Sequence, residues 1–213
     1  MYKLIAAAFL IFHITAVSAQ TGWKLKSEND GIKVYTSTVN DSKFKAIKVE
    51  CELNATAAQL VKVILDVKNC TEWLYHTKVS TLLKEVSPAE IYYYSEISIP
   101  WPVQNRDFVA HLTVTQNPET KVITIDGPAV NGMVPLKDGI VRVRSSKGLW
   151  VITPVKKNFL KVVYTLQVDP GGSIPAWLVN LFAAEGPMKS FQGLKSQIKK
   201  PAYHNAELSF IKD

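Results

Sequence analysis

The chain has few of the side chains that enzymes commonly use for catalysis. It contains two cysteines and four histidines, and no histidines stand at the short spacings that bind a metal ion. The Gly-x-Ser-x-Gly motif of a serine nucleophile is absent, as is a glycine-rich phosphate loop with its lysine. We therefore expect no catalytic residues, no metal and no cofactor.

Long uncharged apolar runs are also missing, apart from one at the N-terminus. That run covers residues 4–17, follows Lys3 and precedes the small residues Ser18 and Ala19. It is shorter than the about 20 residues that a membrane span needs, and the pattern is typical of a secretory signal peptide. We predict a signal peptide over 1–19, a domain over 20–205, a loosely held tail over 206–213, and a secreted or periplasmic location.

The two cysteines are too few for a disulfide framework, but an exported protein could still join Cys51 to Cys70. A predicted helix of about 13 residues lies between them and separates its ends by about 20 Å. Bridged cysteines need α-carbons within about 7 Å of each other. We therefore expect two free, buried thiols.

Acidic residues are fewer than basic ones, and the net charge is +7. Removing residues 1–19 takes away one lysine and leaves +6. The basic residues are dispersed and form no nucleic-acid-binding motif, so we expect no nucleic-acid partner. Four lysines near the C-terminus could make transient contact with an anionic membrane surface, or only keep a helix face hydrated: Lys189, Lys195, Lys199 and Lys200.

Most of the remaining chain alternates apolar and polar residues with the period of a β-strand. The alternation is clearest over 47–53 and 160–168. Weaker alternation covers 31–38, 78–86, 90–98, 107–116, 121–126, 140–144 and 148–155. Because short turn sequences separate these segments, we predict antiparallel pairing.

Two segments have helical periodicity. The first begins at Thr56, which forms a capping box with Gln59, and is predicted to end near residue 67. The second is capped by Ser173 and continues to about residue 198, with a kink expected at Pro187. The order of elements indicates an α+β fold in which a curved antiparallel sheet wraps around a long C-terminal helix.

Four segments, in order, resemble the START (steroidogenic acute regulatory protein-related lipid transfer) domain family. They are residues 30–35 (DGIKVY), 60–73, 101–109 (WPVQNRDFV) and 169–180 (DPGGSIPAWLVN). One departure is Leu74, where the family usually has aspartate after Glu-Trp. The resemblance implies a helix-grip fold with an internal hydrophobic cavity for a sterol- or phospholipid-like ligand. It also implies that the C-terminal helix gates the cavity and that no cofactor is needed.

The resemblance implies that Arg106 is a buried arginine pointing into this cavity, toward a carboxylate or a polar group of the ligand. The alternative is a structural salt bridge with Asp107 or Glu96, and Asp107 is expected to organise the turn. The predicted ligand-binding residues are Arg106, Glu96, Tyr94, Trp177, Leu181, Met188 and Phe191. Strand periodicity leaves open which face of 91–97 is inside, and an ordinary packed core is the alternative for the helix residues.

We expect a monomeric lipid-binding or lipid-transfer protein that is not an enzyme. An alternative is a cyclase- or aromatase-like enzyme on the same scaffold, with Glu96 and His111 as an acid–base pair. A third possibility is an interaction module with a collapsed cavity.

Overall fold

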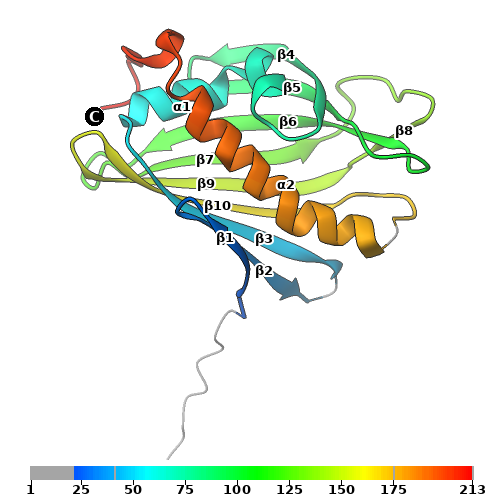
Figure 1. The fold of residues 1–213 in the computed structure, drawn as a ribbon. Helices are drawn as coiled ribbons and strands as arrows, with labels where there is room; N and C mark the ends of the chain where they lie inside the picture. Colours follow the sequence, from blue (N-terminus) through cyan, green and yellow to red (C-terminus); the bar gives the residue numbers. More distant parts are fainter. Residues whose placement is uncertain (1–21, 41, 175, 213) are drawn as a thin grey trace, which may run out of the picture.

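The computed structural model describes residues 22–40, 42–174 and 176–212, and the predicted signal peptide lies outside them. Strands and two α-helices make up this part of the chain (Figure 1). In chain order the elements are β1 Lys24–Asn29, β2 Ile32–Val39, β3 Ser42–Leu53, α1 Ala57–Leu65, the 3-10 helix η1 Val67–Glu72, β4 Thr77–Ser87, β5 Glu90–Ile97, β6 Asn105–Gln116, β7 Ile123–Val130, β8 Ile140–Arg142, β9 Ser145–Lys156, β10 Phe159–Asp169, α2 Ala176–Gln197 and the 3-10 helix η2 Pro201–Tyr203.

The ten strands of the described chain form one sheet, in which nine follow the order β1-β2-β3-β10-β9-β7-β6-β5-β4 and β8 lies off this path. Neighbours along this path pair antiparallel, as predicted from the short turns. The exception is β8, which pairs parallel with the start of β6. Strand β1 was not predicted, because most of its residues are exposed on both faces and it lacks an apolar period.

Helix α1 begins as the sequence predicts. The Thr56 side chain accepts a hydrogen bond from the Gln59 backbone N–H, and the Gln59 side chain accepts one from the Thr56 N–H. This capping box satisfies backbone donors that have no partner inside the helix. The buried face of α1 then covers one end of the core.

Helix α2 lies across the concave face of the sheet (Figure 1). It continues through Pro187 to Gln197, and Leu194 and Ile198 are buried in the main core. Gly193 allows a close approach to η1, because a Cβ at this position would lie 2.5 Å from the carbonyl oxygen of Trp73. This contact holds the C-terminal half of α2 tightly against η1.

The C-terminal segment packs on the domain, so the expectation of a loosely held tail was wrong. Tyr203 is 2% exposed, and its hydroxyl donates to Asp66 and accepts from Gln197. Residue Ile211 is buried, and the Gln116 side chain bonds both the N–H and the carbonyl of Lys212. Buried apolar groups and satisfied backbone groups therefore fix this segment.

Cys51 and Cys70 are free and buried, as predicted. Burial raises the pKa of each thiol to about 12. Within the part of the chain that the structure describes, no helix is long and apolar enough to cross a membrane.

Candidate functional site: a cavity beneath helix α2

The inner face of the sheet is identified by its aromatic contacts with α2. The ring of Phe191 lies 5.3 Å from Trp150 on β9 and 6.0 Å from Tyr164 on β10, measured between centroids. Trp150 and Tyr164 are paired in register, and paired residues of neighbouring strands point to the same face. Their face is therefore the concave one that α2 covers.

The strand register shows which residues of β6 and β5 lie on the same concave face. Ile125 pairs with Trp150, and Val114 pairs with Ile125. Because side chains alternate along a strand, Phe108 and Arg106 share the face of Val114. Tyr93 is also on this face, and its ring meets Phe108 edge-on at 5.8 Å.

Tyr93 and Tyr164 lie on the concave face, where the resemblance predicts an internal cavity. Both keep part of their solvent-accessible surface, although dense surroundings raise the pKa of each phenol well above its ordinary value by desolvation. Both rings lie on the face that α2 covers, so they are candidates for the lining of that cavity.

Arg106 occupies the concave face at the end of β6 where α2 begins. It is 5% exposed, and its guanidinium donates to the carbonyl oxygens of Gln104 and Gly171. Its Nε has no hydrogen-bond partner among the described residues, and burial lowers the pKa of the guanidinium. Among the described residues no carboxylate forms a salt bridge with it, so the predicted structural pairing with Asp107 or Glu96 was wrong.

Asp107 instead pairs with Arg142 of β8, a residue that the sequence did not single out. The two oxygens of Asp107 accept hydrogen bonds of 2.6 and 3.0 Å from Arg142. Arg142 also donates to the carbonyls of Val134 and Pro135, which ties loop 131–139 to the sheet. Asp107 thus organises the chain around it, as expected, through a buried ion pair.

Tyr94 and Glu96 lie on the convex face, so they do not line the cavity beneath α2. Glu96 pairs in register with Asp107, whereas Arg106 pairs with Ile97 and faces the other way. The Glu96 carboxylate accepts from Lys78 and Asn105. Because side chains alternate along β5, Tyr94 lies on the same convex face as Glu96.

Two predicted helix residues face the core, and two cannot be assessed. Met188 and Phe191 are 8% and 3% exposed, and Phe191 contacts the aromatic residues that border the cavity. The side chains of Trp177 and Leu181 lie outside the described part of the structure. Ligand contact by these four residues stays a prediction.

The proposed acid–base pair of Glu96 and His111 is not assembled. His111 contacts Glu90 at 2.8 Å and stacks on Tyr92, both on the convex face. Four strand positions separate His111 from Asp107, the partner of Glu96, a distance of about 13 Å. These two residues are too far apart to act on one substrate atom together.

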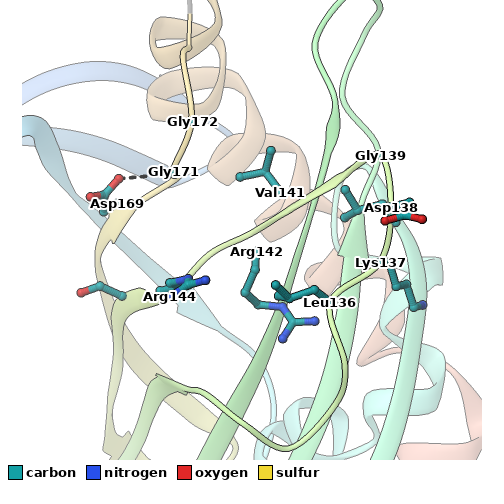
Figure 2. Close-up of a pocket in the computed structure, with 12 residues that line it drawn as sticks. Leu136, Lys137, Asp138, Gly139, Val141, Arg142, Arg144, Asp169, Gly171 and Gly172 are labelled. Atoms are coloured by element: carbon teal, nitrogen blue, oxygen red, sulfur yellow. Dashed lines mark hydrogen bonds between the residues drawn. The ribbon is translucent and has the colours of Figure 1, made fainter.

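An open cleft of about 550 Å³ lies beside Arg106, between residues 136–145 and the turn 169–172. Figure 2 shows Arg142 and Arg144 between the loop and this turn. Gly171 and Gly172 have φ values of +67° and +61°, a conformation that glycine adopts without strain. The turn directs the chain into α2, and Val141 packs against it.

The same end of the molecule carries exposed apolar side chains. Trp101 is 91% exposed, and Leu136 and Met133 are 63% and 40% exposed. The loops that hold them precede β6 and β8, which pair in parallel, so both loops leave the sheet at one end. Figure 1 shows the start of α2 at this end as well.

A strongly curved antiparallel sheet that holds a long C-terminal helix on its concave face is a helix-grip fold. The START domain family model matches residues 11–202, and the chain therefore belongs to the START domain family.

Relatives and solved structures agree with this assignment. An uncharacterized protein of Pseudomonas aeruginosa is 32% identical over 204 residues, 93% of this chain and 97% of that protein. Mouse phosphatidylcholine transfer protein is 28% identical over 184 residues, 83% of this chain and 82% of that protein. The crystal structure of a STAR-related lipid transfer protein fragment from Xanthomonas axonopodis has a TM-score of 0.77 and 36% identity, covering 84% of this chain and 99% of that chain.

Proposed function

We propose that this protein binds one lipid-like molecule in the cavity beneath α2 and transfers it between membranes. The observation that carries the proposal is the aromatic concave face beneath α2, on which Tyr93 and Tyr164 are only partly buried. An aromatic and aliphatic lining with few polar groups suits an apolar ligand. The similarity to phosphatidylcholine transfer protein and to a STAR-related lipid transfer protein supports the same function.

The proposal includes a gate at the start of α2. The glycine turn 171–172 precedes the helix, and the close packing of Gly193 on Trp73 holds its other end. Movement is therefore easier at the N-terminal end of α2, next to the cleft. We propose that lipid enters and leaves there.

The proposal also includes transient docking on a membrane at this end. Trp101, Met133 and Leu136 present apolar surface, and Lys137 and Arg144 are cations beside them. Of the C-terminal lysines, Lys195 and Lys200 are instead engaged by Asp30 and Glu72. Docking through apolar residues should persist in salt, whereas docking through lysines should weaken sharply.

We further propose that the protein is exported and acts as a monomer. The support for export is the signal-like segment over residues 1–19. N-terminal sequencing of the protein recovered from culture medium or periplasm tests this, and a chain beginning at Gln20 is the expected result.

Native mass spectrometry of residues 20–213 tests the binding function, followed by denaturing extraction and lipid analysis. We expect a one-to-one adduct of lipid mass. A bare protein mass that persists after incubation with mixed lipid vesicles would contradict the proposal. Turnover of the extracted lipid into a new species would instead favour an enzyme on this scaffold.

A further inference from the structure

We infer that loops 98–104 and 131–139 form one docking platform for a lipid bilayer, coupled by a charge row made of Lys78, Glu96, Asp107 and Arg142. The inference rests on the proposed membrane docking and adds that the two loops engage the bilayer as a unit.

The charge row crosses four neighbouring strands, β4, β5, β6 and β8, on the convex face. Glu96 pairs in register with Asp107, and Asp107 pairs with Arg142. The nitrogen-to-oxygen distance is 3.1 Å from Lys78 to Glu96 and 2.6 Å from Arg142 to Asp107. The side chains of the two acids and of the arginine are 6%, 1% and 5% exposed, so salt screens their charges only weakly.

Two acids stand side by side at the centre of the row. Like charges directly opposite each other on paired strands repel, so Glu96 and Asp107 each require a nearby cation. Lys78 supplies a cation at one end of the row, and Arg142 supplies one at the opposite end. Because loss of either cation would leave both carboxylates with one partner, a change at one end alters the forces on the side chain at the other.

The first loop, 98–104, is attached to Glu96. The Asn105 side chain donates to Glu96 at 3.0 Å, and its carbonyl oxygen accepts from the Ile99 N–H at 3.0 Å. Lys78 donates to the same oxygen of Glu96. Glu96 therefore fixes the base of the loop that presents Trp101.

The second loop, 131–139, is attached to Arg142. This guanidinium donates to the carbonyl oxygens of Val134 and Pro135, at 3.3 and 3.1 Å. A second attachment is Lys137, whose Nζ lies 4.3 Å from the centre of the Tyr94 ring. The charge row therefore holds both loops on the same three strands.

The side chains on the platform suit a lipid bilayer. Trp101, Leu136 and Met133 are 91%, 63% and 40% exposed, and Lys137 and Arg144 are cations beside them. An aromatic ring next to basic side chains matches the headgroup region, where apolar and anionic groups meet.

Hydrogen exchange of residues 20–213, read by mass spectrometry, tests the coupling without any membrane. A peptide covering 97–104 contains the amide of Ile99, which donates to the attachment of the first loop. A peptide covering 139–144 contains the amides of Ile140 and Val143, which donate to carbonyl oxygens at the base of the second loop. Peptides from β9 and β10 serve as the internal reference.

The variant Lys78→Met removes the cation at the end of the row farthest from the second loop. Among the described residues, Lys78 forms no hydrogen bond or ion pair with that loop. We expect exchange to rise by about twofold to fivefold, relative to the reference, in both loop peptides. The matched control is Lys84→Met, an exposed lysine of the same strand without an ion pair in the described chain, and it should leave both peptides unchanged. A rise at 139–144 no larger than that of β9 and β10 would overturn the inference.

Vesicles of phosphatidylcholine and phosphatidylglycerol test the platform on the wild-type protein. We expect exchange in both loop peptides to slow with the same midpoint of lipid concentration, because the loops engage together. Protection of one loop alone, or two separate midpoints, would overturn the inference, as would loop protection that rises with protein concentration in the absence of lipid, because a second copy would then cover the loops. Absence of vesicle binding would overturn the proposed docking itself, and the lipid-free comparison distinguishes that failure from a failure of the coupling.

Discussion

Two adjacent residues of β6 carry opposite charges and meet opposite environments. Arg106 lies on the concave face, and its acceptors are backbone carbonyls. Asp107 lies on the convex face, where both its oxygens accept hydrogen bonds from Arg142. Strand alternation alone separates them. Their adjacency in sequence suggests an ion pair, but neighbouring strand residues point apart and do not pair.

Replacement of Asp107 by asparagine should strongly destabilise the fold. The substitution leaves Arg142 buried without a counter-charge and loosens loop 131–139, at a cost of about 3–5 kcal/mol. Urea unfolding measures the change. The control is Glu28→Gln, in an exposed pair with Lys33 at 3.7 Å, which should change stability by at most about 1 kcal/mol. A similar small change for Asp107→Asn would show that the buried pair contributes little.

The two thiols should be unreactive in the folded protein. Burial raises the pKa of Cys51 and of Cys70 to about 12, so almost no thiolate exists at pH 8. A thiol-reactive dye should label neither residue in buffer and both in denaturant. Because the pKa of each thiol is higher in the folded protein than in the unfolded one, the two protonated thiols stabilise the fold. This stabilisation is fully present below the unfolded pKa near 9 and is lost as pH rises toward 12. Rapid labelling of the native protein would contradict this.

At the scale of the element, α2 is held differently along its length. Its C-terminal end packs Gly193 on Trp73 and joins a polar network in which Gln197 donates to Glu72 and to Tyr203. The sequence predicted the extent of both helices closely, because the apolar period and, for α1, the capping box are local signals. It did not predict this network, since Glu72 and Gln197 lie far apart in the chain and only the fold brings them together.

Replacement of Gly193 by alanine should lower the melting temperature, although alanine favours helix. The added Cβ would lie 2.5 Å from the Trp73 carbonyl oxygen, so α2 must shift away from η1, at a cost of about 1–3 kcal/mol. Thermal unfolding followed by circular dichroism measures the effect. Ser196→Ala, at an exposed position of the same helix, is the control and should be neutral or slightly stabilising. A rise in melting temperature for Gly193→Ala would contradict the prediction, because it would mean that the helix accommodates a Cβ beside the Trp73 carbonyl oxygen without loss of stability.

At the scale of the whole molecule, the two ends of the sheet differ in character. One end is closed by α1, η2 and the packed C-terminal segment, and the other carries the cleft and exposed apolar loops. Most of the strands and the fold family could be predicted from alternation and from the motif segments. The sequence could not predict which face of each strand is the inner one, because the side-chain period of two is the same for either face. It also could not predict the parallel pairing of β8, which has no local signal in the sequence.

Trp101→Ala should weaken binding to lipid vesicles by roughly tenfold, because the membrane loses one large apolar contact. Vesicle co-sedimentation at low and at high salt measures the binding, and the loss of affinity should be similar at the two salt concentrations. Val155→Ala removes apolar surface near the β9–β10 turn at the other end of the sheet and should have little effect. Equal binding by wild type and Trp101→Ala would place the docking surface elsewhere.

The burial of both native thiols has a practical consequence for following this protein at work. A Leu136→Cys variant would carry a reactive sulfur on the exposed apolar loop, with Cys51 and Cys70 protected inside the fold. Under the proposed docking, an environment-sensitive fluorophore attached there would brighten as the loop enters a bilayer. The arrival and departure of the protein at a lipid vesicle could then be timed optically, without removing either cysteine.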